Sequence, residues 1–271
     1  MTAALLLALA VAAWFSWRYA WWRPATDERC PRILMYHMIS PPRPGGRFNG
    51  LRVSPRLFER QLRWLQQQGW HSFTVGELLQ QGERLPPRSF AITFDDGYAD
   101  NLLQALPLLQ KYDCKATLYL VVERFGRDWS VQRKAHHDSG ELREEPKLSD
   151  QQVRELLASG RIELGSHSLT HANFLRLDAE AASRELGESR ARLQQTFGVA
   201  VDSFAWPFGL YRPEQVALAA QAGYRSAVTV QEGIDDPRSW KPLELRRIKI
   251  SGRDGWLAFR LRLRGGRRGW R

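Results

Sequence analysis

The chain is poor in cysteine. Of its 271 residues only Cys30 and Cys114 are cysteines, and they lack the spacing of a zinc-binding cysteine cluster. The two cysteines could form one disulfide or remain two unpaired buried thiols, and we favour the thiols. Internal repeats and helix-turn-helix or ribonucleoprotein signatures are also missing. The formal net charge of +11 could attract nucleic acid, but the sequence contains no nucleic-acid-binding motif to support that function. We therefore predict no nucleic-acid partner.

The amino-terminal apolar segment lacks a preceding lysine or arginine. It runs from Ala3 to Phe15 and continues as an aromatic-rich stretch to Trp22. A secretory signal normally opens with positive charge, whereas clustered aromatics are typical of the membrane interface. We therefore predict that residues 1–23 form a transmembrane anchor or an uncleaved signal, in contact with lipid. The arginines follow this segment, which by the positive-inside rule favours a cytoplasmic domain.

Two adjacent carboxylates stand at the end of an apolar run. The run Phe90–Phe94 reads as a fully buried strand, and Asp95 and Asp96 follow it directly, with Gly97 behind them. In a parallel α/β protein such a strand delivers its last residues to the active-site face. Neighbouring acids there repel each other unless a cation lies close by.

Two histidines follow a second predicted strand, Ile162–Ser166. His167 and His171 are four residues apart. On a helical turn they would share one face and could bind the same ion. One aspartate and two histidines, with a position open for water, form the ligand set of a catalytic zinc-like site. The sequence therefore predicts that Asp96, His167 and His171 converge on one cation.

Strand and helix patterns alternate along the chain, as a parallel barrel requires. Caps predict helices that begin at Ser54-Pro55, at Ser149 and at Asp178. The remaining predicted elements are a helix near 101–111 and strands at 33–37, 72–75, 116–121, 203–206, 226–230 and 245–250. The predicted fold class is α/β, with seven or eight β/α units.

Together, the acidic and histidine motifs resemble the polysaccharide deacetylases of carbohydrate esterase family 4, which share the NodB homology domain. The resemblance covers Arg32 to Ile250. It implies a distorted (β/α)7-8 barrel in residues 24–250, preceded by the membrane segment and followed by a basic helix and tail in 251–271. It also implies an N-acetylated cell-surface or cell-wall polysaccharide as substrate, which favours the extracytoplasmic side of a membrane. The oligomeric state stays open.

His37 carries the main departure from the family pattern. Classical members place a Leu-x-His motif on the last barrel strand, but all six histidines here precede Ala172. The permuted branch that includes the poly-N-acetylglucosamine deacetylases moves that strand to the front, where Leu34-Met35-Tyr36-His37 stands. The resemblance then implies that His37 is the general acid and that the strand 33–37 lies beside 90–94. The plain alternative is a histidine buried at a strand end.

A third family motif, usually Arg-x-Pro-Tyr, is altered to residues 205–209, Ala-Trp-Pro-Phe-Gly. Its arginine, the usual tether of the catalytic acid group, is missing, and Arg247 could take over that role. Trp206 and Phe208, which flank Pro207, are as easily core residues as platforms for a sugar ring.

The resemblance implies a metal-dependent N-deacetylation that releases acetate. One divalent ion, Zn²⁺ by preference, would be held by Asp96, His167 and His171 and would polarise the acetyl carbonyl. Asp95 would be the general base, and His37 would protonate the departing amine. The backbone N–H of Phe208 would help to stabilise the oxyanion. An O-acetyl esterase is the alternative reaction; a catalytically silent glycan-binding relative would have lost one of the acidic or histidine positions.

Two further segments have open interpretations. The long connection 123–147 contains His136-His137-Asp138, which reads as part of a polar lid more readily than as a metal site. The tail 251–271 reads as a closing helix with a basic end, or as a segment attracted to anionic lipid or to an acidic glycan.

Overall fold

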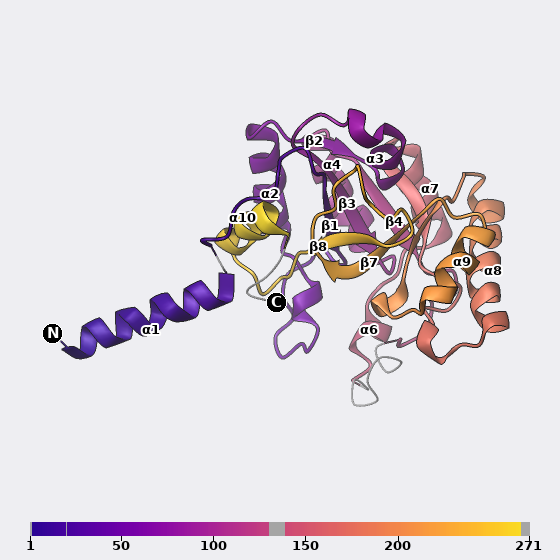
Figure 1. Cartoon of the computed structure of the whole chain (residues 1–271). Helices are drawn as coiled ribbons and strands as arrows, with labels where there is room; N and C mark the ends of the chain where they lie inside the picture. The colour runs from indigo at the N-terminus through magenta and orange to yellow at the C-terminus, as the bar shows by residue number, and fades with distance from the viewer. Residues whose placement is uncertain (1, 20, 130–138, 267–271) are drawn as a thin grey trace.

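The fold is a barrel of parallel strands surrounded by helices (Figure 1). The structure is a computed structural model that describes residues 2–19, 21–129 and 139–266. Its strands are β1 (Arg32–Tyr36), β2 (His71–Phe73), β3 (Ser89–Asp95), β4 (Ala116–Leu120), β5 (Ile162–Ser166), β6 (Ser203–Ala205), β7 (Ser226–Glu232) and β8 (Leu245–Lys249). The predicted residues 136–138 lie outside the described part of the chain.

Seven strands form the closed ring. The order runs β1-β8-β7-β6-β5-β4-β3, and β1 also pairs with β3, which closes the barrel. Strand β2 lies outside this ring and pairs only with the first residues of β3. The β1–β3 register aligns Met35 with Thr93 and Tyr36 with Phe94. The predicted neighbourhood of strands 33–37 and 90–94 is therefore confirmed, and the barrel has the smaller of the two predicted sizes.

The helices lie outside the strands. They are α2 (Pro55–Gln67), α3 (Val75–Gln81), α4 (Leu106–Lys111), α6 (Glu141–Glu144), α7 (Asp150–Ala158), α8 (Ala179–Phe197), α9 (Pro213–Gln221) and α10 (Trp256–Gly265). Ser54, Ser149 and Asp178 each accept a hydrogen bond from the backbone three residues on, so the three predicted helix starts are confirmed. The predicted helix near 101–111 begins as a π-helical turn, Asn101–Ala105, before α4.

The predicted strand 72–75 is wrong at its end. Strand β2 stops at Phe73, because Thr74 and Glu77 form a capping box that starts α3 at Val75. Each side chain accepts a hydrogen bond from the other residue's backbone N–H, and this reciprocal pair favours a helix over continued strand. Helices α3 and α9 were not predicted from the sequence.

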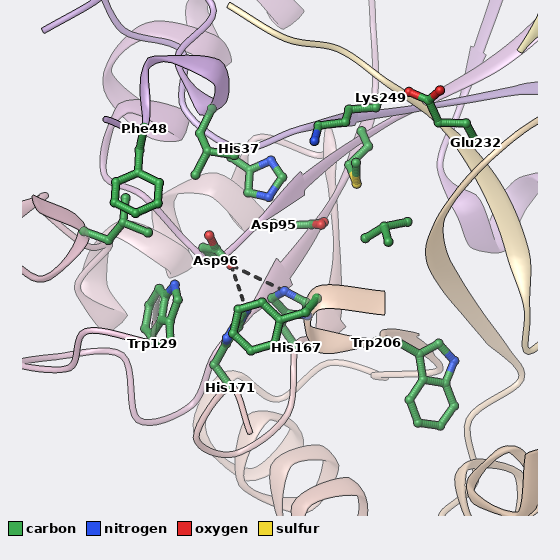
Figure 2. A pocket seen from close by; sticks show the side chains of 15 residues that line it. His37, Phe48, Asp95, Asp96, Trp129, His167, His171, Trp206, Glu232 and Lys249 are labelled. Atoms are coloured by element: carbon green, nitrogen blue, oxygen red, sulfur yellow. Dashed lines mark ion pairs between the residues drawn. The ribbon is translucent and has the colours of Figure 1, made fainter. Parts of the chain in front are cut away.

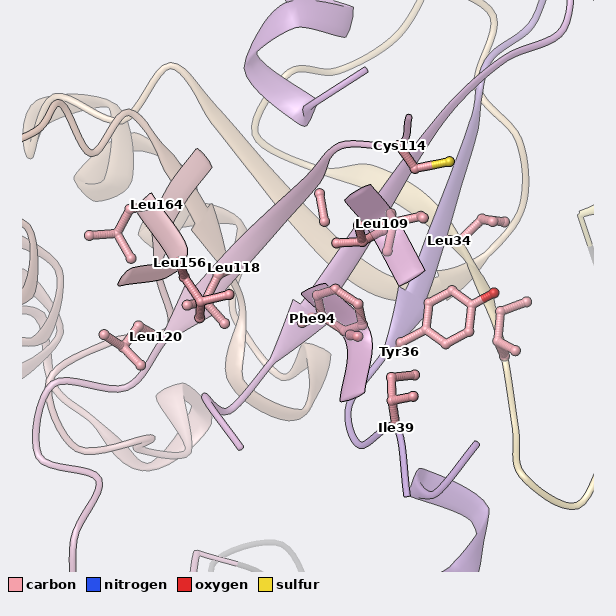
Figure 3. Close-up of a cluster of buried hydrophobic side chains, with 14 of the residues drawn as sticks. Leu34, Tyr36, Ile39, Phe94, Leu109, Cys114, Leu118, Leu120, Leu156 and Leu164 are labelled. Carbon is pink, nitrogen blue, oxygen red and sulfur yellow. The ribbon is translucent and has the colours of Figure 1, made fainter. Parts of the chain in front are cut away.

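The core has two layers that follow from strand alternation. Leu34, Tyr36 and Phe94 belong to the large cluster between strands and helices (Figure 3). The neighbouring positions Ile33 and Ala91 belong to a smaller cluster that fills the barrel interior. Because side chains alternate along a strand, odd and even positions of β1 and β3 face different layers. The same parity decides which residues reach the interior at the strand ends.

The amino-terminal helix α1 (Thr2–Tyr19) extends away from the barrel beside α10 (Figure 1). Its 18 residues span about 27 Å, which is less than the ~30 Å hydrocarbon core of a bilayer. Within the described chain, none of the helices combines the length and apolarity required to cross a membrane, so the predicted transmembrane segment in 1–23 is not supported. Cys30 and Cys114 are buried free thiols, as expected.

Candidate active site

The inward-facing positions at the carboxyl ends of the strands enclose a cavity of about 370 Å³ (Figure 2). Its polar lining comes from sequence-distant strands and the loops that follow them. The lining side chains are Met35, His37, Phe48, Leu51, Asp95, Asp96, Trp129, Leu142, His167, His171, Trp206, Phe208, Val230, Glu232 and Lys249. Parallel topology explains this gathering, because all these strand ends meet at one mouth of the barrel.

Asp96, His167 and His171 form the tightest cluster in this cavity. The Nε2 atoms of His167 and His171 lie 3.4 and 3.3 Å from Asp96 Oδ1. One ligand atom from each of the three buried residues lies within 4.8 Å of the others, so the set could hold a metal ion. The sequence-based expectation that the three side chains converge is met.

The two histidines do not share a helical turn. Residues 167–171 form an irregular loop in which Ser168 and His171 have positive φ angles of 68° and 58°. The expected i, i+4 helical geometry is therefore wrong, although the side chains still converge. The loop owes its shape to α8: Glu185 accepts hydrogen bonds from the backbone N–H groups of Leu169 and Thr170 at 2.9 and 3.0 Å.

The hydrogen bond of the His167 ring bears on what the cluster could hold. Its Nδ1 lies 2.7 Å from the carbonyl oxygen of Ala205, so Nδ1 carries the proton and the neutral ring presents a lone pair at Nε2. That lone pair faces Asp96 Oδ1, which is also an acceptor. Two acceptors at this distance require a proton or a cation between them. The donor set fits a divalent metal such as Zn²⁺.

The protonation state of Asp96 agrees with this view. Burial opposes ionisation of the carboxyl group, but the neighbouring imidazoles of His167 and His171 outweigh it and hold the pKa of Asp96 well below its usual range. Asp96 has a φ of 76° and is followed by Gly97 at 78°, a pair of left-handed residues that turns the chain sharply after β3. Aspartate tolerates this region better than most residues.

Backbone strain concentrates around the cavity. In the described chain, six non-glycine residues have positive φ, and four of them belong to the site. These four are Asp96, Ser168, His171 and Phe208. Such conformations persist only where the surroundings enforce them, and they are common at functional sites.

Asp95 and Arg247 form a buried, two-pronged ion pair. Arg247 Nη1 and Nη2 lie 2.7 and 2.8 Å from the two carboxylate oxygens of Asp95, and neither residue is more than 2% exposed. Arg247 also donates from Nη1 to Thr93 and from Nε to the Thr229 carbonyl. Burial would raise the pKa of Asp95, but the Arg247 charge outweighs it and lowers the pKa. The guanidinium therefore fixes both the charge and the orientation of this carboxylate.

His37 lies in the same cavity, directly after β1. Its carbonyl oxygen accepts a hydrogen bond of 2.9 Å from the buried Asn101 side chain, which anchors this strand end. Burial lowers the pKa of His37, while Asp96 and Asp95 oppose the decrease. Figure 2 shows its ring across the cavity from His167 and His171.

The altered third motif packs mainly as core. Trp206 is fully buried, stacks on Tyr211 at 4.5 Å and donates from its indole nitrogen to the Leu243 carbonyl. This packing favours the core interpretation over a sugar platform. The Phe208 ring contacts the His171 ring edge-on at 4.4 Å, and the buried Pro207 precedes it. Arg247 is buried, and its guanidinium binds Asp95, Thr93 and the Thr229 carbonyl.

Sequence reasoning missed Trp129, which lines the cavity, and Lys147, which lies against it. Trp129 is buried and stacks on His171 with ring centroids 4.9 Å apart. The Lys147 ammonium lies 5.0 Å from the Trp129 ring centroid, and burial lowers the pKa of Lys147 to about 8. Both residues fall in the connection 123–147, where the sequence offers no periodicity that could have identified them.

A buried salt bridge joins two parts of this wall. Arg52 Nη2 lies 3.1 Å from Glu141 Oε1 and 2.6 Å from Glu145 Oε1. Glu141 also accepts a 2.8 Å hydrogen bond from the Arg47 backbone N–H. The bridge therefore connects the segment carrying Phe48 and Leu51 to helix α6, which carries Leu142.

Comparison with known proteins agrees with this architecture. The polysaccharide deacetylase family model matches residues 82–227. The chain is 30% identical over 235 residues to the Bacillus subtilis protein YxkH, named as a polysaccharide deacetylase, and the match covers 86% of this chain and 75% of that one.

Two further relatives extend the comparison. A Staphylococcus aureus poly-β-1,6-N-acetyl-D-glucosamine N-deacetylase is 23% identical over 199 residues, covering 69% of this chain and 64% of the enzyme. The solved structure of the Streptococcus pyogenes deacetylase PplD in complex with acetate superposes with a TM-score of 0.69 at 25% identity, covering 85% of this chain and 95% of that one. The chain belongs to the polysaccharide deacetylases of carbohydrate esterase family 4.

Proposed function

We propose that the protein removes acetyl groups from the N-acetylhexosamine units of a polysaccharide, in a reaction that depends on a divalent metal and releases acetate. The observation that carries the proposal is the juxtaposition of two differently partnered aspartates. Asp96 faces two imidazoles, whereas Asp95 is paired with Arg247. This separation gives adjacent carboxylates different chemical roles.

Asp96, His167 and His171 are the proposed ligands, with Zn²⁺ as the preferred ion. Two imidazole nitrogens and one carboxylate oxygen are a ligand set of catalytic zinc, which keeps a further position open. When bound, such an ion polarises the acetyl carbonyl and lowers the pKa of water. The Ala205 carbonyl supports the ligand role of His167, because it holds the ring in the tautomer with Nε2 free.

Asp95 is the proposed general base. Arg247 keeps its carboxylate ionised, so it can accept a proton from the attacking water at neutral pH. The two-pronged contact also restricts rotation of the carboxylate, which keeps its oxygens at the wall of the cavity. Arg247 is a positioning residue in this scheme.

His37 is the proposed general acid for the leaving amine. It directly follows β1, whose last residue Tyr36 pairs with Phe94 just before the acidic pair, and it lines the cavity shared with the three proposed ligands. The low pKa that burial gives His37 makes its protonated form a stronger acid than an exposed imidazolium. The backbone N–H of Phe208 is the proposed second donor to the oxyanion, from a turn held at a positive φ.

The proposed substrate class rests on the relatives and on the cavity wall. A poly-β-1,6-N-acetyl-D-glucosamine N-deacetylase is among the similar proteins. Trp129 and Phe48 line the cavity with aromatic surface, which suits the apolar face of a sugar ring. Poly-N-acetylglucosamine or a related N-acetylated glycan is therefore the first substrate to test.

The deciding experiment is acetate release from a panel of N-acetylated and O-acetylated glycans, with and without a chelator. We expect release from N-acetylated chains, loss on chelation and recovery when Zn²⁺ is restored. His171→Ala should lose both metal content and turnover. Full activity in chelator would contradict the metal dependence, and release from O-acetylated chains alone would make the protein an esterase.

A further inference from the structure

A second cavity of about 410 Å³ lies at the opposite end of the barrel. Its polar lining includes Arg32, which begins β1, and Arg88, which directly precedes β3. Trp70, which directly precedes β2, also lines it. In a parallel barrel the amino ends of the strands lie opposite the carboxyl ends, so this basic cavity and the candidate active site face away from each other.

The basic cavity is strongly cationic. Its lining contains four arginines, Arg32, Arg88, Arg260 and Arg264, and one carboxylate, Glu28. Glu28 forms a salt bridge with Arg88, with 2.8 Å between Glu28 Oε2 and Arg88 Nε. Four positive charges minus one negative charge leave a net charge of +3 in the lining. An anionic ligand complements this charge.

Arg32 is the innermost of these arginines. It is 2% exposed and donates hydrogen bonds to the backbone carbonyl oxygens of Leu263, Asp27, Cys30 and Thr26. Its guanidinium also lies 5.3 Å from the Trp70 ring centroid. In the part of the chain that the structure describes, Arg32 makes no ion pair with a carboxylate. Its charge is held by neutral dipoles, and its field persists in the cavity.

Helix α10 supplies the outer wall. Leu257, Arg260, Leu261 and Arg264 all line the basic cavity, and their spacing of three, four and seven residues puts them on one helix face. Ala258 and Phe259 are buried against the barrel instead, while the buried Leu263 lies at the base of the cavity lining. Leu257 is 49% exposed, and Arg260 and Arg264 are exposed. Leucines interleaved with arginines on an exposed helix face are typical of helices that lie in a lipid interface.

Apolar surface continues beyond the cavity rim. Arg264 donates a hydrogen bond to the Trp21 carbonyl oxygen, which joins α10 to the aromatic pair Trp21 and Trp22. These tryptophans are 49% and 42% exposed, and α1 beyond them exposes Leu5, Leu6, Leu7 and Leu9. A soluble phosphate would use the arginines but leave this apolar rim uncovered. A phospholipid matches both features, because its phosphate meets the arginines where its acyl chains meet the rim.

We propose that the basic cavity binds the phosphate of an anionic lipid headgroup, so that the amino end of the barrel docks on a lipid surface. The docking uses α10, the residues before β1 and β3, and the adjoining aromatic pair. It directs the candidate active site away from the lipid, toward material outside the headgroup layer. The binding does not depend on the proposed deacetylation, and its test uses no activity measurement.

The test is flotation of the full chain with vesicles of phosphatidylcholine, alone or mixed with phosphatidylglycerol. We expect binding to prefer the anionic vesicles. Arg260→Glu/Arg264→Glu should reduce that preference by more than about 25-fold, because each arginine near an anionic surface contributes roughly fivefold in affinity and the two new carboxylates add repulsion. Arg260→Gln/Arg264→Gln is a milder second variant that should lose a smaller part, and thermal unfolding establishes that both variants are folded.

The matched control is Arg176→Glu/Arg184→Glu, which makes the same change in net charge at two exposed arginines. Arg184 lies on α8, on the other side of the barrel from α10 in Figure 1. The control should keep the preference of the unmodified chain. An equal loss of preference in the control would mean that binding depends only on the net charge of the protein, and it would overturn the proposal.

Two other results would also overturn the proposal. Equal binding to neutral and anionic vesicles would mean that apolar contact alone drives association. Saturable binding of inorganic phosphate in calorimetry, without a preference for anionic vesicles, would assign the cavity to a soluble anion instead of a lipid.

Discussion

The two ends of the barrel hold buried charge in different ways. At the carboxyl end, Asp95 is paired with the charge of Arg247, and Asp96 faces two imidazoles with which it could hold a cation. At the amino end, the buried Arg32 is compensated by backbone carbonyls. Paired charges fix each other's geometry and can be tuned for proton transfer. Backbone dipoles carry no net charge, so they do not cancel the positive charge of the arginine that they hold. That charge can still attract an external anion.

The contrast between the two ends of the barrel predicts where substitutions should affect chemistry. A change at the carboxyl end removes a partner from a side chain that the proposed reaction uses directly. Removal of an arginine from an ion pair elsewhere should affect stability alone. Substitutions at the two kinds of position should therefore separate loss of turnover from loss of stability.

Asp95→Asn should reduce turnover by about 10²–10⁴-fold, because it removes the proposed general base. Metal content should be unchanged, since the proposed ligands Asp96, His167 and His171 remain. Steady-state kinetics and metal analysis of the same preparation measure both quantities. A parallel loss of metal would mean that the roles of the two aspartates are exchanged.

Arg247→Met should destabilise the fold by about 3–5 kcal/mol, because it leaves the buried Asp95 carboxylate without its counter-charge. Turnover of the folded protein should fall as well, since the base loses its orientation. Urea unfolding and kinetics measure the two effects. Arg190→Met is the control: Arg190 binds the Val201 carbonyl and Asp202 away from the cavity, so stability should fall and turnover should not.

His37→Gln should reduce amide hydrolysis by about 10²-fold while hydrolysis of an activated acetate ester falls much less. An amine needs a proton to depart, whereas a good leaving group does not. The ratio of the two rates is the measurement. Equal damage to both substrates would give His37 a structural role, through the strand end that Asn101 anchors.

Asp100→Asn should produce the smallest effect, one that depends on pH. Burial raises the pKa of Asp100 to about 7, and no arginine pairs with it as Arg247 pairs with Asp95 among the described residues. A carboxyl group whose pKa is higher in the folded than in the unfolded state destabilises the fold as pH rises from about 4 to 7. The variant removes this penalty.

Urea unfolding at pH 4 and pH 8 measures the effect of Asp100→Asn. The variant should gain on the order of 1–3 kcal/mol relative to the unmodified protein at pH 8, and almost nothing at pH 4. A gain of the same size at both pH values would come from changed packing rather than from titration.

Local patterns in the sequence were sufficient for much of the barrel. Helix starts at Ser54, Ser149 and Asp178 were predictable because a cap involves residues three positions apart. The apolar runs of β1 and β3 marked buried strands in the same way. Strand β2 was placed imprecisely, because the Thr74 capping box competes with strand formation within a few residues.

The candidate site was predictable only in part. The acidic pair and the two histidines stood out because each follows a strand, and parallel strands end at one mouth of the barrel. Nothing local pointed to Trp129 or Lys147, and the wrong helical turn was assigned to His167 and His171. Their actual loop depends on Glu185, which lies in a helix far along the chain.

Residues close together in the sequence were sufficient to predict most of the strands, the helix starts at Ser54, Ser149 and Asp178, and the polar residues at the ends of β1, β3 and β5, because these features depend on hydrogen bonds and hydrophobic periodicity over a few residues. The tertiary structure alone decided that Arg247 pairs with Asp95 and that Arg32 and Arg260 share a cavity. Those pairs are separated by long stretches of chain. They meet only because barrel closure brings β1 between β3 and β8.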